Sequence, residues 1–343
     1  MLASFLGWYH TKELPSKMQD ATLQQLKSTE AGADTRAAFT PLLYDTVIDE
    51  SDNTLSVEDI KFLSKFINKT YLTNSSISEI RTRFEEESSI QLRHFFNDEW
   101  ASKIMAVTSK EDSEQGLGKG RPALDYMVGT NCDWSILGPV HKQRFLEYNQ
   151  NTKDRDEEKK MESAGSLLQF LREHVLQSVS FGHLLRCITS LGIPTGYRGK
   201  VRRFRPGLDY TIAHYGLITQ QSVLDATLCF VAGTGSQADH NPNMEYSIER
   251  EQDAIWESGD AGGFECYISA EDEEEVEKGA ESKAEDEYDD EDDSKLLSVP
   301  ASKNTLSLVY RDPGTIRFIK YLSSSAPSSR WDLSLEYQLQ NID

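Results

Sequence analysis

Five basic side chains lie within eight positions of an otherwise acidic sequence, and they are the residues best suited to chemistry: Arg198, Lys200, Arg202, Arg203 and Arg205. Arginine binds carboxylates and phosphates through two parallel hydrogen bonds. The run could therefore recognise phosphate or an acidic segment of a partner. Alternatively, its arginines pair with acids of the same chain and brace neighbouring strands, the candidates being Asp209, Asp312 and Asp332. We favour this structural interpretation, because a strand buries alternate side chains.

The stretch from Gly192 to Gly216 must position these side chains. Its early glycines and a proline predict turns up to Gly199, after a helix that ends near Leu191. Two short strands are expected next, Lys200–Phe204 and Leu208–Tyr215. Between them, Pro206-Gly207 predicts a type II turn, because proline presets φ and glycine tolerates a positive φ.

The motif Arg-Arg-Phe-Arg-Pro-Gly-x-Asp-Tyr-Thr, which starts at Arg202, resembles the C-terminal domain of the 2-oxoglutarate- and iron-dependent prolyl 3,4-dihydroxylases that act on a small-subunit ribosomal protein. In fungi this half is called the oxoglutarate/iron-dependent oxygenase C-terminal degradation domain. Two further blocks agree, and the three lie in family order: Trp134–Phe145, and a second motif made of Leu308–Ser323 followed by Ala326–Ser334. The candidate partner-binding or structural residues within the motifs are Arg202, Arg203, Arg205, Asp209, Tyr210, Asp312, Arg317, Arg330, Trp331 and Asp332.

The resemblance implies a fold and a chemistry. The fold is a degenerate double-stranded β-helix, α+β in class and mainly β, flanked by N-terminal helices. The chain itself would hold no catalytic, metal or cofactor-binding residue, while Fe(II), 2-oxoglutarate and ascorbate would belong to the parent family's upstream domain. The implied partner is a protein (a ribosomal protein, a transcription factor or a regulatory inhibitor) in the cytoplasm and nucleus.

A search for iron ligands agrees with that implication. A non-haem Fe(II) oxygenase holds its metal with two histidines and one carboxylate, two of which come as His-x-Asp or His-x-Glu in this fold. None of the seven histidines is followed two places later by a carboxylate. The HExxH and paired cysteine–histidine spacings of zinc sites are also missing. We therefore interpret His214 as a hydrogen-bonded core histidine.

The domain organisation is expected to have four parts. Residues 1–12 resemble the last strand of the family's catalytic half, because Phe5-Leu-Gly-Trp-Tyr-His matches its closing run. Residues 13–40 are a linker, and residues 41–343 form the C-terminal domain. Inside it, 271–295 is predicted to be a disordered acidic insert, because fifteen acids and two lysines between Glu271 and Asp293 cannot build a core.

Hydrophobic periodicity places helices first and strands later, which favours an α+β fold or a sandwich with a helical flank. The expected helices are Val57–Asn68, Ser76–Glu87, Ile90–Val107, Leu167–Leu176 and Phe181–Leu191. A loop is expected from Thr108 to Gly120. The expected later strands are Ser222–Ala232, Gly262–Ser269 and Ser307–Leu322.

The bulk properties exclude some classes of protein. Most of the net charge of −21 comes from the acidic insert, so the remainder is only mildly acidic, which argues against a broad nucleic-acid surface. Four widely separated cysteines indicate reduced, mostly buried thiols. No apolar run reaches the roughly 18 residues that a membrane-spanning helix needs, so we expect a soluble protein.

Three functions remain open. The favoured one is a non-catalytic interaction and regulatory domain of a prolyl-hydroxylase-type dioxygenase, linked to oxygen sensing, protein turnover or translation. Alternatively, the chain belongs to an active peptidyl-proline dioxygenase whose iron site lies in an upstream domain absent from this sequence. An RNA-binding module is the third; the basic run favours it, and the acidic balance and the lack of interleaved aromatics oppose it.

Overall fold

The computed structural model describes residues 38–44, 54–118, 125–149, 162–232, 254–270 and 295–339. The expectations for 1–12, for most of 13–40 and for nearly all of 271–295 fall outside these residues. Within the described residues, no helix is long and apolar enough to cross a membrane. The described residues include all four cysteines; Cys187, Cys229 and Cys266 are buried, as expected.

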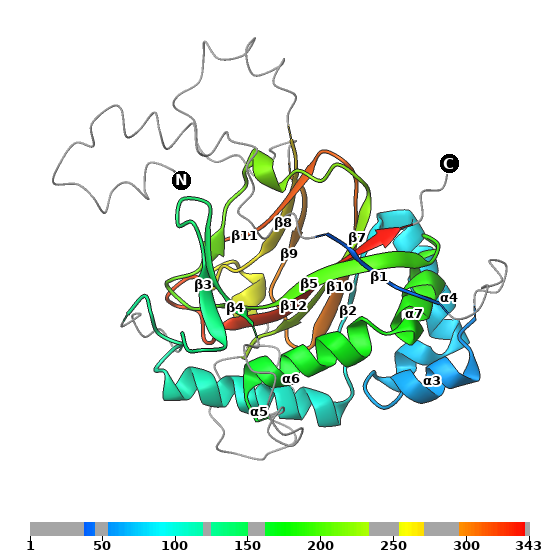
Figure 1. The fold of residues 1–343 in the computed structure, drawn as a ribbon, viewed down its shortest axis with the longest axis horizontal. Helices are drawn as coiled ribbons and strands as arrows, with labels where there is room; N and C mark the ends of the chain where they lie inside the picture. The colour runs from blue at the N-terminus through cyan, green and yellow to red at the C-terminus, as the bar shows by residue number, and fades with distance from the viewer. Residues whose placement is uncertain are drawn as a thin grey trace, which may run out of the picture.

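The described residues form two antiparallel sheets (Figure 1). The larger sheet has the strand order β2-β10-β7-β12-β5-β4-β3, with β1 paired to β5 and β6 paired to β4. The smaller sheet has the order β11-β8-β9. Its three strands are Thr315–Ile319 (β11), Glu265–Ser269 (β8) and Lys295–Val299 (β9). The strands of the larger sheet are Thr40–Pro41 (β1), Ser89–Leu92 (β2), Trp134–Leu137 (β3), Gln143–Tyr148 (β4), Pro194–Phe204 (β5), Tyr210–Thr211 (β6), Val223–Phe230 (β7), Thr305–Arg311 (β10) and Arg330–Leu339 (β12).

The connectivity is that of a double-stranded β-helix, as the sequence predicts. From β5 onward the chain passes repeatedly between the sheets: β7, β10 and β12 join the larger one, and β8, β9 and β11 build the smaller one. Strands distant in sequence thereby become neighbours. β12 lies between β5 and β7, and its Asp332 stands opposite Arg202 of β5 and Cys229 of β7. The two motifs of the sequence, about a hundred residues apart, are thus paired side by side.

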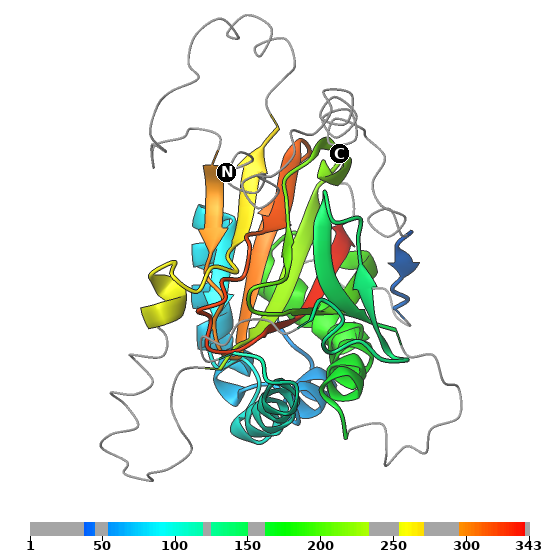
Figure 2. The ribbon, with the colours of Figure 1, turned by 90° about the vertical axis from the view of Figure 1, so that its left-hand side faces the viewer.

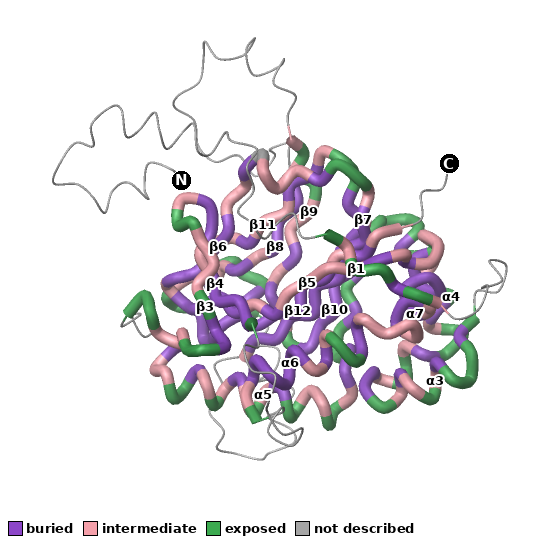
Figure 3. Tube along the Cα trace, viewed as in Figure 1, coloured by how far each residue is buried: buried purple, intermediate pink, exposed green. Residues whose placement is uncertain are grey.

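Helices cover one face of the larger sheet (Figure 2). They are Val57–Leu63 (α3), Asn74–Glu87 (α4), Asp98–Glu114 (α5), Ala164–Leu171 (α6) and Val179–Thr189 (α7); a π-helical turn, Arg172–Leu176, extends α6. Three of them start at serine caps: Ser56 accepts a hydrogen bond from the Asp59 N–H, Ser163 forms a capping box with Ser166, and Ser178 accepts a hydrogen bond from the Phe181 N–H. Their apolar residues pack with the sheet in one core cluster of buried residues (Figure 3), which includes Leu171, Leu184, Leu185, Leu333, Leu335 and Tyr337.

The helix predicted from Ile90 to Val107 is wrong. This segment begins as β2, which pairs with β10 through Ile90 and Leu92, and α5 starts only at Asp98. His94 has φ +52°, outside the helical region. The side chain of Asn97 caps α5 by accepting a hydrogen bond from the Trp100 N–H. α5 then continues to Glu114, through most of the segment predicted to be a loop.

Three strand predictions need correction as well. β5 begins at Pro194 instead of after a series of turns, and a Cβ atom on its Gly199 would lie only 2.5 Å from the Ser334 carbonyl oxygen. The strand from Leu208 shrinks to Tyr210–Thr211. The strand from Ser307 to Leu322 is two strands, β10 and β11, which belong to different sheets because a turn at Pro313-Gly314 separates them. Glycine suits that turn, since Gly314 has φ +85°.

Candidate functional site

The central strands carry one apolar face and one polar face. Successive side chains of a strand point to opposite sides of a sheet. In β12, the apolar face packs in the core cluster with the helices and consists of Trp331, Leu333, Leu335 and Tyr337. The polar face, turned towards the smaller sheet, consists of Asp332, Ser334 and Glu336 on β12, Arg198, Lys200 and Arg202 on β5, and Asp225 and Thr227 on β7. A charged inner face is unusual for packed sheets, whose buried positions are normally apolar.

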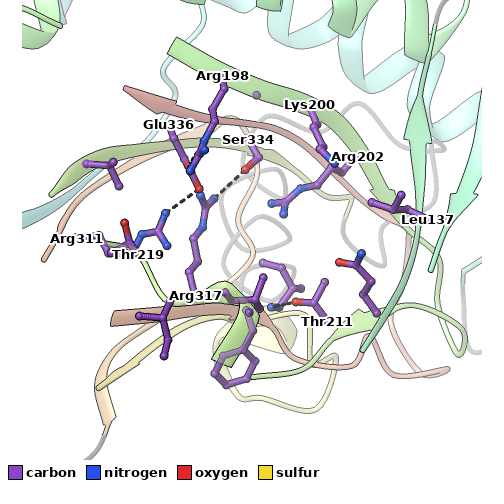
Figure 4. A pocket seen from close by; sticks show the side chains of 18 of the residues that line it. Leu137, Arg198, Lys200, Arg202, Thr211, Thr219, Arg311, Arg317, Ser334 and Glu336 are labelled. Carbon is purple, nitrogen blue, oxygen red and sulfur yellow. Dashed lines mark hydrogen bonds and ion pairs between the residues drawn. The ribbon is translucent and has the colours of Figure 1, made fainter. Parts of the chain in front are cut away.

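This polar face forms one wall of a cavity of about 660 Å³. Figure 4 shows Arg198, Lys200 and Arg202 of β5 on one side and Arg317 of β11 on the other, with Arg311 of β10 at the far end. Leu137, Phe145, Leu217, Phe318 and Ile319 add apolar surface. The cavity therefore lies between the two sheets and combines five cationic side chains with a partly apolar lining.

Carboxylates hold the cavity's arginines in fixed positions. Arg202 donates from Nε and Nη2 to the two oxygens of Asp332, at 2.7 and 3.0 Å. Arg317 pairs with Glu265 and, through Nη1 at 3.1 Å, with Asp225. On the other side of Asp225, Arg311 lies 2.9 Å from it and also donates to Glu336. Arg202 and Asp332 thus form the ion pair that the sequence predicts between β5 and the second motif.

Burial and the neighbouring arginines shift the pKa values of the network's acids in opposite directions. Burial by itself would raise the pKa of Glu265, but Arg317, Arg330 and Arg202 together lower it to about 2. Glu336 behaves alike: burial is outweighed by Arg311 and Arg198, and its pKa falls below the usual range. For the fully buried Asp225, burial prevails over its arginine partners and raises the pKa. The two glutamates are therefore ionised at neutral pH and act as counter-ions for the arginines around them.

Arg203 points away from the cavity, into the apolar side of the sheet. It is fully buried and donates to Asp112 and Gln115 of the α5 end, both at 2.6 Å. Its guanidinium also stacks 4.2 Å from the ring of Trp331. Asp112 further accepts hydrogen bonds from the N–H and hydroxyl of Ser329, at 2.8 and 2.6 Å. This arginine therefore fastens α5 to β5 and β12.

Arg205 and Asp209 form a second buried pair across the turn at Pro206-Gly207, where Gly207 has φ +75°. The Arg205 side chain donates to both oxygens of Asp209 and to the carbonyls of Tyr126 and Val128. The following residue, Tyr210, donates its hydroxyl to the Val140 carbonyl. Arg205 and Tyr210 therefore have structural roles, because their hydrogen bonds hold the turn that leads into β6.

Two other predicted site residues have different surroundings. Arg330 is buried and donates to Asp332 at 3.1 Å and to the carbonyl of Gly263. Asp312 is exposed in the turn between β10 and β11, where its carbonyl accepts a hydrogen bond from Thr315. Asp312 pairs with none of the three motif arginines, all of which have other partners.

The sequence analysis missed most of the other charged residues of the site: Glu147, Arg311 and Glu336 in the cavity lining, and Asp225 and Glu265 behind it. A signal was available for some of them. Asp225 and Thr227 alternate with Leu224, Ala226 and Leu228, and Asp332, Ser334 and Glu336 alternate with four large apolar residues. Such a strict alternation in a buried strand predicts a polar inner face. For Glu265 and Arg311 the local sequence offered no comparable pattern.

His214 is a buried, uncharged histidine. Its Nδ1 accepts a hydrogen bond from the Gly216 N–H at 3.1 Å. Burial, followed by the nearby Lys142 and His141, lowers its pKa from 6.5 to about 4. This environment confirms the hydrogen-bonded histidine expected from the sequence, although the residue lies just after β6 rather than in a long strand.

The titration of His214 predicts a loss of stability in mild acid. Because the unfolded chain binds a proton below about pH 6.5 and the folded chain only near pH 4, stability falls as the pH drops through this window. His214→Asn keeps an acceptor for Gly216 without the titration. Between pH 7 and 5, thermal denaturation should lower Tm by about 2–4 °C more in the wild type than in this variant. The exposed His94→Asn serves as the control, and equal losses in all three proteins would contradict the prediction.

The fold and the charged cavity define the chain as a double-stranded β-helix protein with a cationic interior. The family model described as "oxoglutarate and iron-dependent oxygenase degradation C-term" matches residues 58–343, and the chain belongs to this family. Among curated proteins, the prolyl 3,4-dihydroxylase OGFOD1 of Ostreococcus tauri is 34% identical over 338 residues, which is 97% of this chain and 58% of that protein. The prolyl 3-hydroxylase sudestada1 of Drosophila melanogaster is 24% identical over 274 residues, covering 77% of this chain and 40% of that protein.

Solved structures of lower similarity are also found. A prolyl hydroxylase from Trichoplax adhaerens, in complex with a fragment of the hypoxia-inducible-factor oxygen degradation domain, has a TM-score of 0.39 and 12% identity, covering 84% of this chain and 95% of that one. A Pseudomonas putida prolyl-4-hydroxylase has a TM-score of 0.36 and 11% identity, covering 77% of this chain and 99% of that one.

The comparisons correct the function favoured from the sequence. We expected a separate, non-catalytic interaction and regulatory domain, and this is wrong: 97% of the chain matches a prolyl 3,4-dihydroxylase at 34% identity, so the chain is not separate from a hydroxylase. The same match overturns the expectation that no cofactor belongs to this chain. It favours the first alternative, in which the chain belongs to an active peptidyl-proline dioxygenase. The chain spans 58% and 40% of the two curated relatives' lengths.

The described cavity does not fit an Fe(II) centre. Two imidazoles and one carboxylate are needed on one face of such a metal. Within the described ranges no group of three His, Cys, Asp or Glu residues is arranged to hold a metal ion. The cavity is lined instead by arginine and lysine, whose positive charges disfavour a cation. We therefore assign no step of oxygen activation to the cavity's side chains.

Proposed function

We propose that this chain forms part of a 2-oxoglutarate- and Fe(II)-dependent dioxygenase that hydroxylates prolyl residues in proteins. The observation that supports the proposal most is the match to a prolyl 3,4-dihydroxylase along 97% of the chain. A second relative, which shares a shorter stretch, is named a prolyl 3-hydroxylase. In this proposal the iron ligands come from outside the described residues, because the described cavity does not fit the metal.

The described double-stranded β-helix has a supporting part in this function. Buried ion pairs join neighbouring strands, as Arg202–Asp332 does, and join the two sheets, as Arg317–Asp225 does. In this proposal a catalytic unit and a peptide are held against this braced framework. The protein substrate in the proposal is a small-subunit ribosomal protein in the cytoplasm or nucleus. This finer part is supported by the sequence motifs that start at Arg202 and Leu308.

The basic run gives no support to the RNA-binding alternative. Arg203 and Arg205 are 0% exposed, and Arg202 is held by two hydrogen bonds to Asp332. Phosphate contacts need accessible cations. We therefore propose a protein substrate and no nucleic acid.

An assay of the whole gene product that contains this chain tests the proposal. Incubation with Fe(II), 2-oxoglutarate, ascorbate and proline-containing ribosomal peptides should release succinate, and mass spectrometry should find one added oxygen atom per hydroxylation on proline. Omitting Fe(II) or replacing the target proline by alanine should abolish both signals. Release of succinate without any oxidised proline, or no turnover under these conditions, would refute the proposed activity.

A further inference from the structure

The cavity between the sheets contains arginine donors that the protein's own acids do not use. Arg202 bonds Asp332 through Nε and Nη2, and its Nη1 makes no hydrogen bond within the described part of the chain. Arg311 donates from Nη2 to Asp225 and Glu336, and its Nη1 likewise has no hydrogen bond there. Both residues line the cavity. Because guanidinium donors prefer charged oxygen acceptors, these two Nη1 groups are suited to bind a negatively charged ligand.

The charges around the cavity support the same ligand. Its lining includes five cations, Arg198, Lys200, Arg202, Arg311 and Arg317, and two carboxylates, Glu147 and Glu336. Both carboxylates are already held: Glu147 lies 3.4 Å from Lys200, and Glu336 pairs with Arg198 and Arg311. Three further acids do not line the cavity but pair with its arginines: Asp225, Glu265 and Asp332. Little side-chain entropy is lost when such fixed arginines bind an anion.

We propose that this cavity binds a small dicarboxylate without a metal ion. One carboxylate accepts hydrogen bonds from Arg202 and the other from Arg311, which lie on opposite sides of the cavity (Figure 4). Phe145, Leu217 and Phe318 provide an apolar wall for the carbon chain between the two carboxylates. A cavity of about 660 Å³ is in the usual range for small-molecule sites. The inference does not depend on the proposed hydroxylase activity.

Calorimetric titration of the chain with glutarate, in the presence of EDTA, tests the site. We expect saturable binding of one glutarate per chain that weakens as salt is added, because the contacts are ionic. Arg202→Gln removes one set of donors and should weaken binding about tenfold or more. The control is Arg83→Gln on α4, whose exposed side chain pairs only with Glu87 in the described structure and should leave the affinity unchanged. Equal affinities of wild type and Arg202→Gln would overturn the proposal.

A second variant covers the case in which Arg202→Gln does not fold. Ile218→Trp leaves every charge in place and adds bulk at the cavity lining, so it should also abolish binding. Propionate, with one carboxylate, should bind at least about tenfold more weakly than glutarate. A short peptide with two neighbouring aspartates tests whether the two carboxylates come from a protein instead of a small molecule. If this peptide binds more tightly than glutarate, the ligand is a protein segment. Binding that requires added Fe(II), or no saturable binding of any of these acids, would overturn the inference.

Discussion

Replacing Glu265 by Gln is expected to lower the free energy of unfolding by about 3–5 kcal/mol, the usual cost of leaving buried charges without their partner. Glu265 is 1% exposed and pairs with Arg317 and, at 3.4 Å, with Arg330. It also accepts a hydrogen bond from Thr227 at 3.1 Å. Glutamine keeps the shape but neutralises the charge, so both arginines stay buried with one counter-ion fewer. Urea denaturation at pH 7 measures the change.

Glu265 should also make the free energy of unfolding depend on pH in the acid range. Its pKa of about 2 in the folded protein lies below the ordinary value of 4.5, so the unfolded chain takes up a proton first as the pH falls. The stabilisation is fully present above about pH 4.5 and is lost progressively towards pH 2, by an amount on the order of 3 kcal/mol. Glu265→Gln should remove this part of the acid slope. Glu87→Gln, at an exposed pair on α4, should change neither stability nor slope by more than about 0.5 kcal/mol. A Glu265→Gln protein as stable as that control would contradict the expectation.

The fold class could be predicted because family motifs and strand alternation survive in the linear sequence. The pairing of Arg202 with Asp332 could also be predicted, since both motifs have strand patterns and opposite charges. Local sequence patterns gave wrong predictions where contacts between distant segments decide the secondary structure. Ile90 and Leu92 have helical spacing with Phe95 and Phe96, yet they are fixed in β2 by pairing with β10. Likewise, Gly196 and Gly199 predict turns but lie inside β5. Because they have no side chain, the backbones of neighbouring segments can approach them closely there.

The cavity was harder to predict than the fold, because its residues come from strands in both sheets. Arg317 of β11 and Asp225 of β7 are 92 positions apart in the sequence and 3.1 Å apart in space. The sequence also did not show which residues of the basic run face the cavity. Arg203 and Arg205 have structural partners on the other side of the sheet, whereas the cavity uses Arg198, Lys200 and Arg202. Strand periodicity adds Arg198 to the face of Lys200 and Arg202 only once β5 is known to begin at Pro194.

Asp112→Ala is expected to lower the free energy of unfolding by about 3–5 kcal/mol, because it leaves Arg203 buried without its carboxylate. Arg203 is 0% exposed, and Asp112 accepts hydrogen bonds from it and from two groups of Ser329. Arg203→Met removes the charge while keeping a long apolar side chain against Trp331. Once the arginine is gone, the loss of Asp112 should cost much less. The double variant should therefore be more stable than the sum of the single losses predicts, by about 1–3 kcal/mol.

A matched pair on the same helix separates this coupling from a general effect of changing α5. Lys110 and Glu114 are exposed and 3.9 Å apart, so their double-mutant cycle should be additive within about 0.5 kcal/mol. If the Asp112–Arg203 cycle were equally additive, the contact between α5 and β5 would contribute nothing specific to stability. Non-additivity confined to the buried pair would instead show that one arginine of the basic run joins the helical layer to the double-stranded β-helix. The position of the helices on the sheet would then depend on a residue that the sequence motif placed among the candidates for partner binding or a structural role.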